Sequence, residues 1–212
     1  MTKAPRSNAK KPEPARRRFN GLLVVLAVVV VLVVGFGAAQ VYFGSNGVGS
    51  AGAARIGGPF TLIDQDGRTV SDKDFRGKWM LVYFGFTFCP DICPTSLARN
   101  DDALAMLGDK GVKVVPVLIS VDPERDTPER LKDYVKFFSP RLVGLTGSPQ
   151  QIAEVAREYR VYYAKAGQKD DATYLIDHSA LTYLIGPDGR FVQFFRAQAS
   201  PQEIADRLNE LL

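Results

Sequence analysis

The stretch KWMLVYFGFTFCPDICPTSL, residues 78–97, decides how the rest of the sequence is interpreted. It opens with a continuous apolar and aromatic run, Lys78–Phe88, whose length and composition are typical of a buried central strand. Cys89 and Cys93, the only two cysteines of the chain, follow this run, and a helical pattern begins at about Pro94. The cysteine pair is therefore expected between the end of a buried strand and the start of a helix.

Strand-like and helix-like segments alternate around this stretch. Thr127, Ser148 and Ser200 each stand before a proline and an amphipathic segment, which is typical of helix N-caps, and Glu203 would complete a capping box with Ser200. The expected elements are a hairpin at 59–75, a strand at 78–88, a helix from 94 to 108 or 111, a strand at 112–122, a helix from 127, a short strand at 141–147, a helix from 148, a hairpin at 179–195 and a helix from 200.

This order predicts an α/β fold. Alternating strands and helices indicate a parallel sheet covered on both faces, and the last hairpin adds antiparallel strands. The expected architecture is a thioredoxin-like fold with a central mixed sheet, preceded by one N-terminal transmembrane helix. The cysteines fall where that fold places its chemistry.

The positive charge of the chain is concentrated at its N-terminus. Residues 1–20 contain seven basic residues and one acidic residue, a net charge of +6, whereas the whole chain carries +4. The remainder therefore carries −2, and a basic surface for nucleic acid is not expected on the folded domain.

An apolar segment follows the basic tail. No charged residue occurs between Arg18 and Arg55, and about 20 apolar residues are enough to cross a bilayer. The predicted layout is a basic cytoplasmic tail at 1–20, a transmembrane anchor at 21–43, a flexible tether at 44–57 and a thioredoxin-like domain at 58–212.

This layout places the domain in the periplasm, on the outer side of the cytoplasmic membrane. A cleaved signal peptide is the alternative, because the aliphatic part, Leu22–Val34, is short enough for one. Apolar residues continue to Phe43, which favours an uncleaved anchor.

The soft metal ligands of the domain are few. His178 is the only histidine, and Cys89 and Cys93 are spaced i and i+4, so both sulfurs can lie on one side of a helical turn. Two thiolates and one imidazole suit copper, because Cu(I) accepts soft ligands and a low coordination number. Structural zinc takes four ligands, and the fourth would have to be Asp91, Asp177 or water.

Two alternatives to metal binding remain open from the residues alone. Cysteines at a helix N-terminus react readily, so Cys89 and Cys93 could form a redox-active disulfide or a static one. Thioredoxin-type oxidoreductases carry a proline in the loop that faces the disulfide, whereas residues 176–180, IDHSA, contain a histidine and no proline. That difference favours metal binding over peptide docking.

The chain resembles the Sco/SenC proteins, which are membrane-anchored, thioredoxin-like copper proteins of cytochrome c oxidase assembly. The resemblance covers most of residues 58–212 and rests on four stretches that occur in order: FGFTFCPDICPTSL, LISVDPERDTPERLKDY, LTGSPQQI and DHSALTYLIGPDGRFV. Asp91 matches the family's CPDxCP pattern, and Asp177 precedes the histidine as in the family.

The resemblance implies that Cys89, Cys93 and His178 bind Cu(I) or Cu(II). It implies a copper chaperone, not an enzyme, that takes copper from a donor protein and delivers it to the dinuclear copper site of cytochrome c oxidase subunit II. The alternatives are a thiol-disulfide reductase that keeps the oxidase cysteines reduced and a copper-responsive signalling component.

The polar segment SVDPERDTPE is expected to be a loop and a helix start near the site. Its Asp122, Arg125 and Asp126 are interpreted as a solvated salt-bridge cluster and are assigned no role in copper binding.

Overall fold

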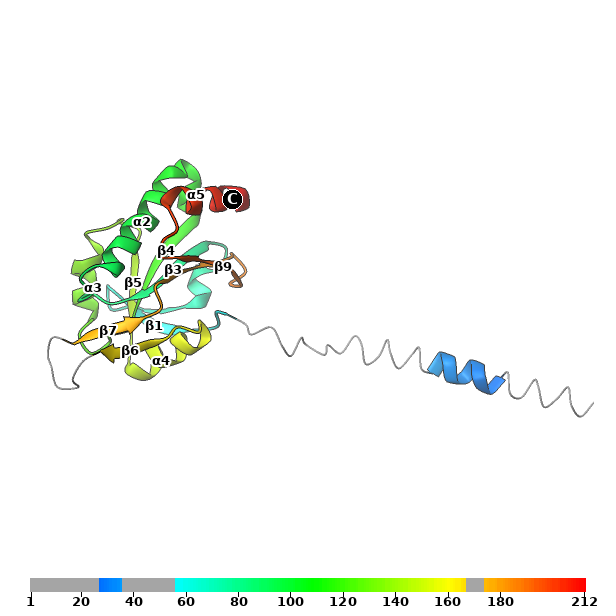
Figure 1. Cartoon of the computed structure of the whole chain (residues 1–212). Coiled ribbons are helices and arrows are strands. Elements are labelled where there is room, and N and C mark those ends of the chain that lie inside the picture. The colour runs from blue at the N-terminus through cyan, green and yellow to red at the C-terminus, as the bar shows by residue number, and fades with distance from the viewer. Residues whose placement is uncertain (1–26, 36–55, 167–173) are drawn as a thin grey trace, which may run out of the picture. The chain divides into compact units, whose positions relative to one another are not determined.

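The computed structural model describes residues 27–35, 56–166 and 174–212 (Figure 1). The chain divides into two units, Met1–Ala53 and Ala54–Leu212, and each is described by itself.

In the first unit, residues 27–35 form a helix with exposed side chains. The rest of the expected anchor, 21–43, lies outside the described residues, as do the tail and nearly all of the tether. Within the described ranges, no helix combines the length and the apolar character that a membrane crossing needs.

A seven-stranded mixed sheet forms the centre of the second unit, as predicted. The strand order is β2-β1-β5-β4-β3-β8-β9, and β3, β4 and β5 are parallel while the other neighbours are antiparallel. The strands are β1 Thr61–Asp64, β2 Thr69–Ser71, β3 Trp79–Gly85, β4 Val114–Ser120, β5 Val143–Thr146, β8 Leu181–Ile185 and β9 Phe191–Arg196.

A second, two-stranded sheet was not predicted. β6, Tyr163–Ala166, pairs antiparallel with β7, Leu175–His178, so the only histidine ends a strand of its own hairpin. Residues 167–173 between the two strands lie outside the described ranges.

The helices begin at the expected caps. The side chains of Thr127, Ser148 and Ser200 each accept a hydrogen bond from a backbone N–H in the first helical turn. Ser148 forms a full capping box, whereas the described residues at Ser200 show only the bond from the Glu203 N–H. The helices are α2 Ile92–Met106, α3 Pro128–Val135, α4 Pro149–Glu158 and α5 Pro201–Leu211, with 3-10 turns η1 Asp72–Phe75 and η2 Gly108–Lys113.

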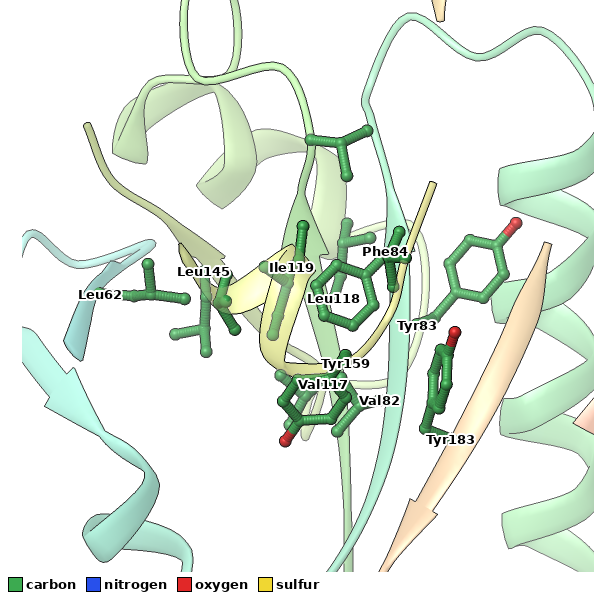
Figure 2. Close-up of a cluster of buried hydrophobic side chains, with 14 of the residues drawn as sticks. Leu62, Val82, Tyr83, Phe84, Val117, Leu118, Ile119, Leu145, Tyr159 and Tyr183 are labelled. Atoms are coloured by element: carbon green, nitrogen blue, oxygen red, sulfur yellow. The ribbon is translucent and has the colours of Figure 1, made fainter. Parts of the chain in front are cut away.

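The buried side chains form two clusters on the sheet. One includes Leu81 of β3 and Leu104 of α2, next to α5. The other extends from β1 across β5 and β4 to β3, where Phe84 packs against Tyr159 with ring centroids 5.2 Å apart (Figure 2). The central strands are thus covered by apolar side chains, which holds the end of β3 in place.

The boundaries around the cysteines differ from the prediction. β3 ends at Gly85, not at Phe88, because the chain then turns and the Cys89 N–H donates a hydrogen bond to the Phe86 carbonyl at 3.2 Å. α2 starts at Ile92, two residues before Pro94, since a proline in the first helical turn removes no intrahelical hydrogen bond. Cys93 consequently lies inside the first turn of the helix.

Replacing Ile119 tests whether the β4 strand is the centre of the core. Ile119 is fully buried, so Ile119→Ala should lower the free energy of unfolding by about 2–5 kcal/mol through lost burial and the cavity left behind. Urea unfolding of residues 54–212 measures this. Val112→Ala, at a side chain that is 68% exposed, is the control and should change the value by less than about 0.5 kcal/mol. Equal effects of the two substitutions would contradict the assignment.

Candidate metal centre

The two cysteines lie on either side of the start of α2. Cys89 is half-buried in the turn after β3, and Cys93 is the second residue of the helix and fully buried. The backbone N–H of Cys93 donates a hydrogen bond to the Cys89 sulfur at 3.4 Å. Since the first N–H groups of a helix have no intrahelical partners, the Cys89 sulfur caps α2, and the positive end of the helix dipole favours a thiolate there.

His178 reaches the cysteines from the end of β7. Its Nε2 lies 3.3 Å from the Cys93 sulfur, and its Nδ1 lies 3.4 Å from the Ser179 carbonyl oxygen. A carbonyl oxygen only accepts hydrogen bonds, so Nδ1 carries the proton in that contact. In that tautomer Nε2 is the ring nitrogen that is free to bind a metal, as a metal-ligating imidazole requires.

The structure brings the three predicted ligand side chains together. The sulfurs of Cys89 and Cys93 and a ring nitrogen of His178 all lie within 4.8 Å of one another. Asp91 and Asp177, the residues considered as a fourth zinc ligand, are exposed and are not part of this group. Two sulfurs and one imidazole nitrogen, joined in the described part of the chain by no carboxylate oxygen, fit copper better than a closed zinc site.

Aromatic side chains and one glycine shape the pocket around these groups. The rings of Tyr83 and Phe86 lie edge-on to the His178 ring, with centroids 6.0 and 5.9 Å away. A Cβ atom added to Gly85 would lie 2.9 Å from a Tyr83 ring carbon and 3.0 Å from the Cys93 sulfur. The end of β3 must therefore be a glycine for the sulfur to sit against the strand.

A groove of about 300 Å³ connects the site with solvent. Cys89 and His178 line this groove, while Cys93 lies behind them. A larger hollow of about 550 Å³ lies over β9 and α5, and no cysteine or histidine lines it. An ion or a reacting group would thus approach from the side of Cys89 and His178.

The two thiols have different acidities. A hydrogen bond from the Cys93 thiol is the main cause that lowers the pKa of Cys89 to about 4, and bonds from the backbone N–H groups of Asp91 and Cys93 act in the same direction. The same bond, together with burial, raises the pKa of Cys93 above its ordinary value. The reduced site without metal therefore holds one thiolate, at Cys89, and one proton, at Cys93.

Buried carboxylates behind the site contradict the solvated cluster expected from the sequence. Asp126 is fully buried in the β4–α3 loop, residues 121–127, and its carboxylate accepts hydrogen bonds from Thr87 N at 3.0 Å, Thr87 Oγ1 at 2.6 Å and Ser120 Oγ at 2.6 Å. Asp122, 1% exposed, accepts hydrogen bonds from Arg125 Nε at 2.5 Å and the Tyr174 hydroxyl at 2.6 Å.

These contacts hold the segment that carries Cys89, because Thr87 precedes it by two residues. The local sequence SVDPERDTPE is mostly polar and charged, so it does not signal that its carboxylates are buried. Their hydrogen-bond partners include Thr87 from the turn after β3, Ser120 at the end of β4 and Tyr174 next to β7. The β6–β7 hairpin itself had a weak sequence signal, namely the short apolar run YLI after GQKDDAT, whose residues are common in turns.

Fold and site together define the class: a thioredoxin-like protein in which two free thiols and one imidazole converge between β3 and α2. The SCO1/SenC family model matches residues 48–212. The chain belongs to this family.

Known relatives agree with this assignment. The mitochondrial SCO1 homolog 1 of Arabidopsis thaliana is 51% identical over 158 residues, covering 74% of this chain and 47% of the relative. The chain spans about half the length of this relative and of the human one.

Solved structures show the same fold. ScoI of Bradyrhizobium japonicum with copper bound is 49% identical and superposes with a TM-score of 0.69, covering 74% of this chain and 99% of that one. BsSco, described as a member of the Sco family of cytochrome c oxidase assembly proteins with a disulfide switch, is 28% identical with a TM-score of 0.57, covering 74% and 92%.

Alkylation of the reduced, metal-free protein tests the assignment of one thiolate. Cys89 should react with iodoacetamide at pH 6, far below the usual cysteine pKa of about 8.5, because its pKa is lowered and it lines the groove. Cys93 should react much more slowly at the same pH. Peptide mass spectrometry after timed quenching measures both rates, and Cys89→Ser is the control that should remove the fast reaction. Faster labelling of Cys93 would contradict the assignment.

Proposed function

We propose that this protein is a copper chaperone that holds copper between Cys89, Cys93 and His178. It delivers this copper to the dinuclear copper site of cytochrome c oxidase subunit II. The observation that carries the proposal is the convergence of the two sulfurs and the ring nitrogen within 4.8 Å. Family membership and the copper-bound relative at 49% identity support it.

The site is prepared for copper by its own residues. Cys89 is already a thiolate, His178 presents the lone pair of Nε2, and only Cys93 has to lose a proton when copper is taken up. Two thiolates suffice for Cu(I), and the imidazole adds the borderline ligand that Cu(II) prefers. Copper uptake therefore releases about one proton per chain near neutral pH.

Release follows from the different exposure of the three ligands. Cys89 and His178 face the groove, so an incoming pair of client thiols meets these two ligands first. Cys93 is fully buried and holds its bond to copper longest. His178 sits on a separate two-stranded sheet, so it can withdraw without disturbing the main sheet. Copper thus passes by exchange of thiolates, without an enzymatic turnover.

The N-terminal segments place the site next to a membrane-bound client. The basic tail at 1–20 stays in the cytoplasm, the segment at 21–43 anchors the chain in the bilayer, and the tether at 44–57 lets the domain move over the periplasmic surface. Confinement to one membrane raises the effective concentration of the site for subunit II. A separate donor protein supplies the copper.

A thiol-disulfide reductase is the second candidate function. The low pKa of Cys89 favours it, because a thiolate is the attacking group in disulfide exchange. The disulfide switch described for BsSco points in the same direction for a relative. In this role Cys89 would attack a client disulfide and Cys93 would resolve the mixed disulfide.

Copper loading of the reduced full chain separates these functions. The chaperone should bind one copper per chain, and X-ray absorption should find two sulfurs and one nitrogen. His178→Ala should weaken Cu(II) binding more than about tenfold, because the only imidazole is lost. Leu175→Ala, on the same strand and 48% exposed, is the matched control and should bind normally.

If the protein is a reductase, the wild type and the His178→Ala variant should give different results from those expected of a chaperone. His178→Ala would then keep the midpoint potential of the cysteine pair and the reduction of a subunit II disulfide, and the wild type would hold little copper. If the His178→Ala variant kept the full Cu(II) affinity of the wild type, the proposed ligand set would be wrong.

A further inference from the structure

The sheet that carries His178 is attached to the domain mainly by side chains. Among the described residues, β6 and β7 pair only with each other and with no strand of the seven-stranded sheet. Ile176 of β7 is buried, and the Val161 N–H before β6 donates a hydrogen bond to the Ala156 carbonyl of α4. The position of His178 relative to the cysteines therefore depends on what else fastens this hairpin.

Alternating cations and aromatic rings connect the hairpin with the cysteine segment. We call this set the cation–aromatic stack; it consists of Lys165, Tyr174, Arg125, Phe88 and Arg130. Lys165 Nζ lies 4.3 Å from the Tyr174 ring centroid, and the Arg130 guanidinium lies 4.2 Å from that of Phe88. Tyr174 immediately precedes β7, and Phe88 immediately precedes Cys89. The stack thus contains one ring from each ligand-bearing segment.

Arg125 joins the two ends. Its guanidinium carbon lies 3.6 Å from the Tyr174 ring centroid and 4.4 Å from that of Phe88. Its Nε donates to the buried Asp122 carboxylate, which also accepts the Tyr174 hydroxyl. The Arg125 side chain is 14% exposed. Its orientation is consequently set by one carboxylate and two rings.

One nitrogen of Arg125 is buried at a cost that the ring contacts have to offset. Its Nη2 is buried without a hydrogen-bond partner in the described part of the chain. An unpaired buried donor costs free energy, so contacts elsewhere on the side chain must offset it. The Tyr174 and Phe88 rings provide those contacts, because the guanidinium lies over both of them.

We infer that Arg125 is a positioning residue that holds the His178 hairpin against the cysteine segment and thereby provides the nitrogen ligand of the copper site. The inference rests on the proposed copper site. Arg125 does not contact the ligand atoms; it acts through Tyr174 on β7 and through Phe88 on the Cys89 turn.

This role makes a selective prediction. Without the central guanidinium the hairpin keeps its internal pairing and its bonds from Tyr174 to Asp122 and from Lys165 to Glu124. It loses the cation that connects the Tyr174 ring with the Phe88 ring of the cysteine segment. Cys89 and Cys93 remain next to each other, because the Cys93 N–H and the turn after β3 hold them. Cu(I) binding by two thiolates should therefore persist, whereas ligation by His178 should be lost.

The test compares the full chain with Arg125→Ala and Tyr174→Leu. Tyr174→Leu removes the ring on the hairpin side and leaves the ion pair of Arg125 with Asp122 in place, so it covers the case in which Arg125→Ala fails to fold. Arg190→Ala is the matched control, since this arginine lies in the β8–β9 turn and its side chain is 83% exposed.

Two readouts are expected to change together. In metal-free protein, hydrogen exchange of the β6 and β7 amides should accelerate more than about tenfold in both variants, with β3 and β4 unchanged. In copper-loaded protein, the nitrogen contribution in X-ray absorption should disappear and Cu(II) affinity should fall by about 10- to 100-fold, while Cu(I) affinity stays within about threefold. Arg190→Ala should match the wild type in every readout.

The outcomes separate the inference from the proposed function. A wild type without a nitrogen ligand would refute the copper site itself. The role of Arg125 would be overturned if the wild type had the nitrogen ligand, both variants kept it, and hydrogen exchange of the hairpin amides did not change. The proposed copper site would then still hold. Arg125→Lys should behave like Arg125→Ala, because a lysine has no planar guanidinium to stack on an aromatic ring; full rescue by lysine would overturn the stacking role.

Discussion

The contact between the Cys93 sulfur and Nε2 of His178, 3.3 Å long, joins residues that are 85 positions apart, and the chemistry of this protein depends on it. Neither side of the contact is a surface loop free to adjust. Cys93 is buried in the first turn of α2 against Gly85, and His178 ends a strand whose neighbour Ile176 is buried. The sheet order that puts β8 next to β3 is what allows the two to meet.

The β4–α3 loop connects both halves of the site. Asp126 holds Thr87, next to the cysteine turn, while Asp122 and Arg125 hold Tyr174, next to the histidine strand. Each carboxylate is buried and each has hydrogen-bond donors, which is the condition under which a buried carboxylate is tolerated. A single polar loop thus contacts both ligand-bearing segments, the turn that carries Cys89 and the β6–β7 hairpin that carries His178.

The electrostatic asymmetry of the cysteine pair serves both functions considered for the family. A thiolate at Cys89 and a buried thiol at Cys93 make a site that is ready to accept a soft cation after losing one proton. In the same arrangement Cys89 is a nucleophile, and Cys93 can resolve the mixed disulfide that Cys89 forms. The imidazole beside them distinguishes the two, because a third ligand strengthens metal binding and does nothing for a resolving thiol.

The sequence by itself determined the mixed α/β sheet, the helix caps at Thr127, Ser148 and Ser200, and the place of the cysteine pair at the junction of β3 and α2. These features depend on hydrophobic periodicity and on hydrogen bonds within one helical turn, so a local pattern records them. Only the tertiary structure decided that Cys93 is buried while Cys89 is not, and that His178 sits on its own hairpin. It also decided that the acidic groups of SVDPERDTPE are internal. Those properties arise from contacts between distant segments, and such contacts leave no periodic trace in either segment.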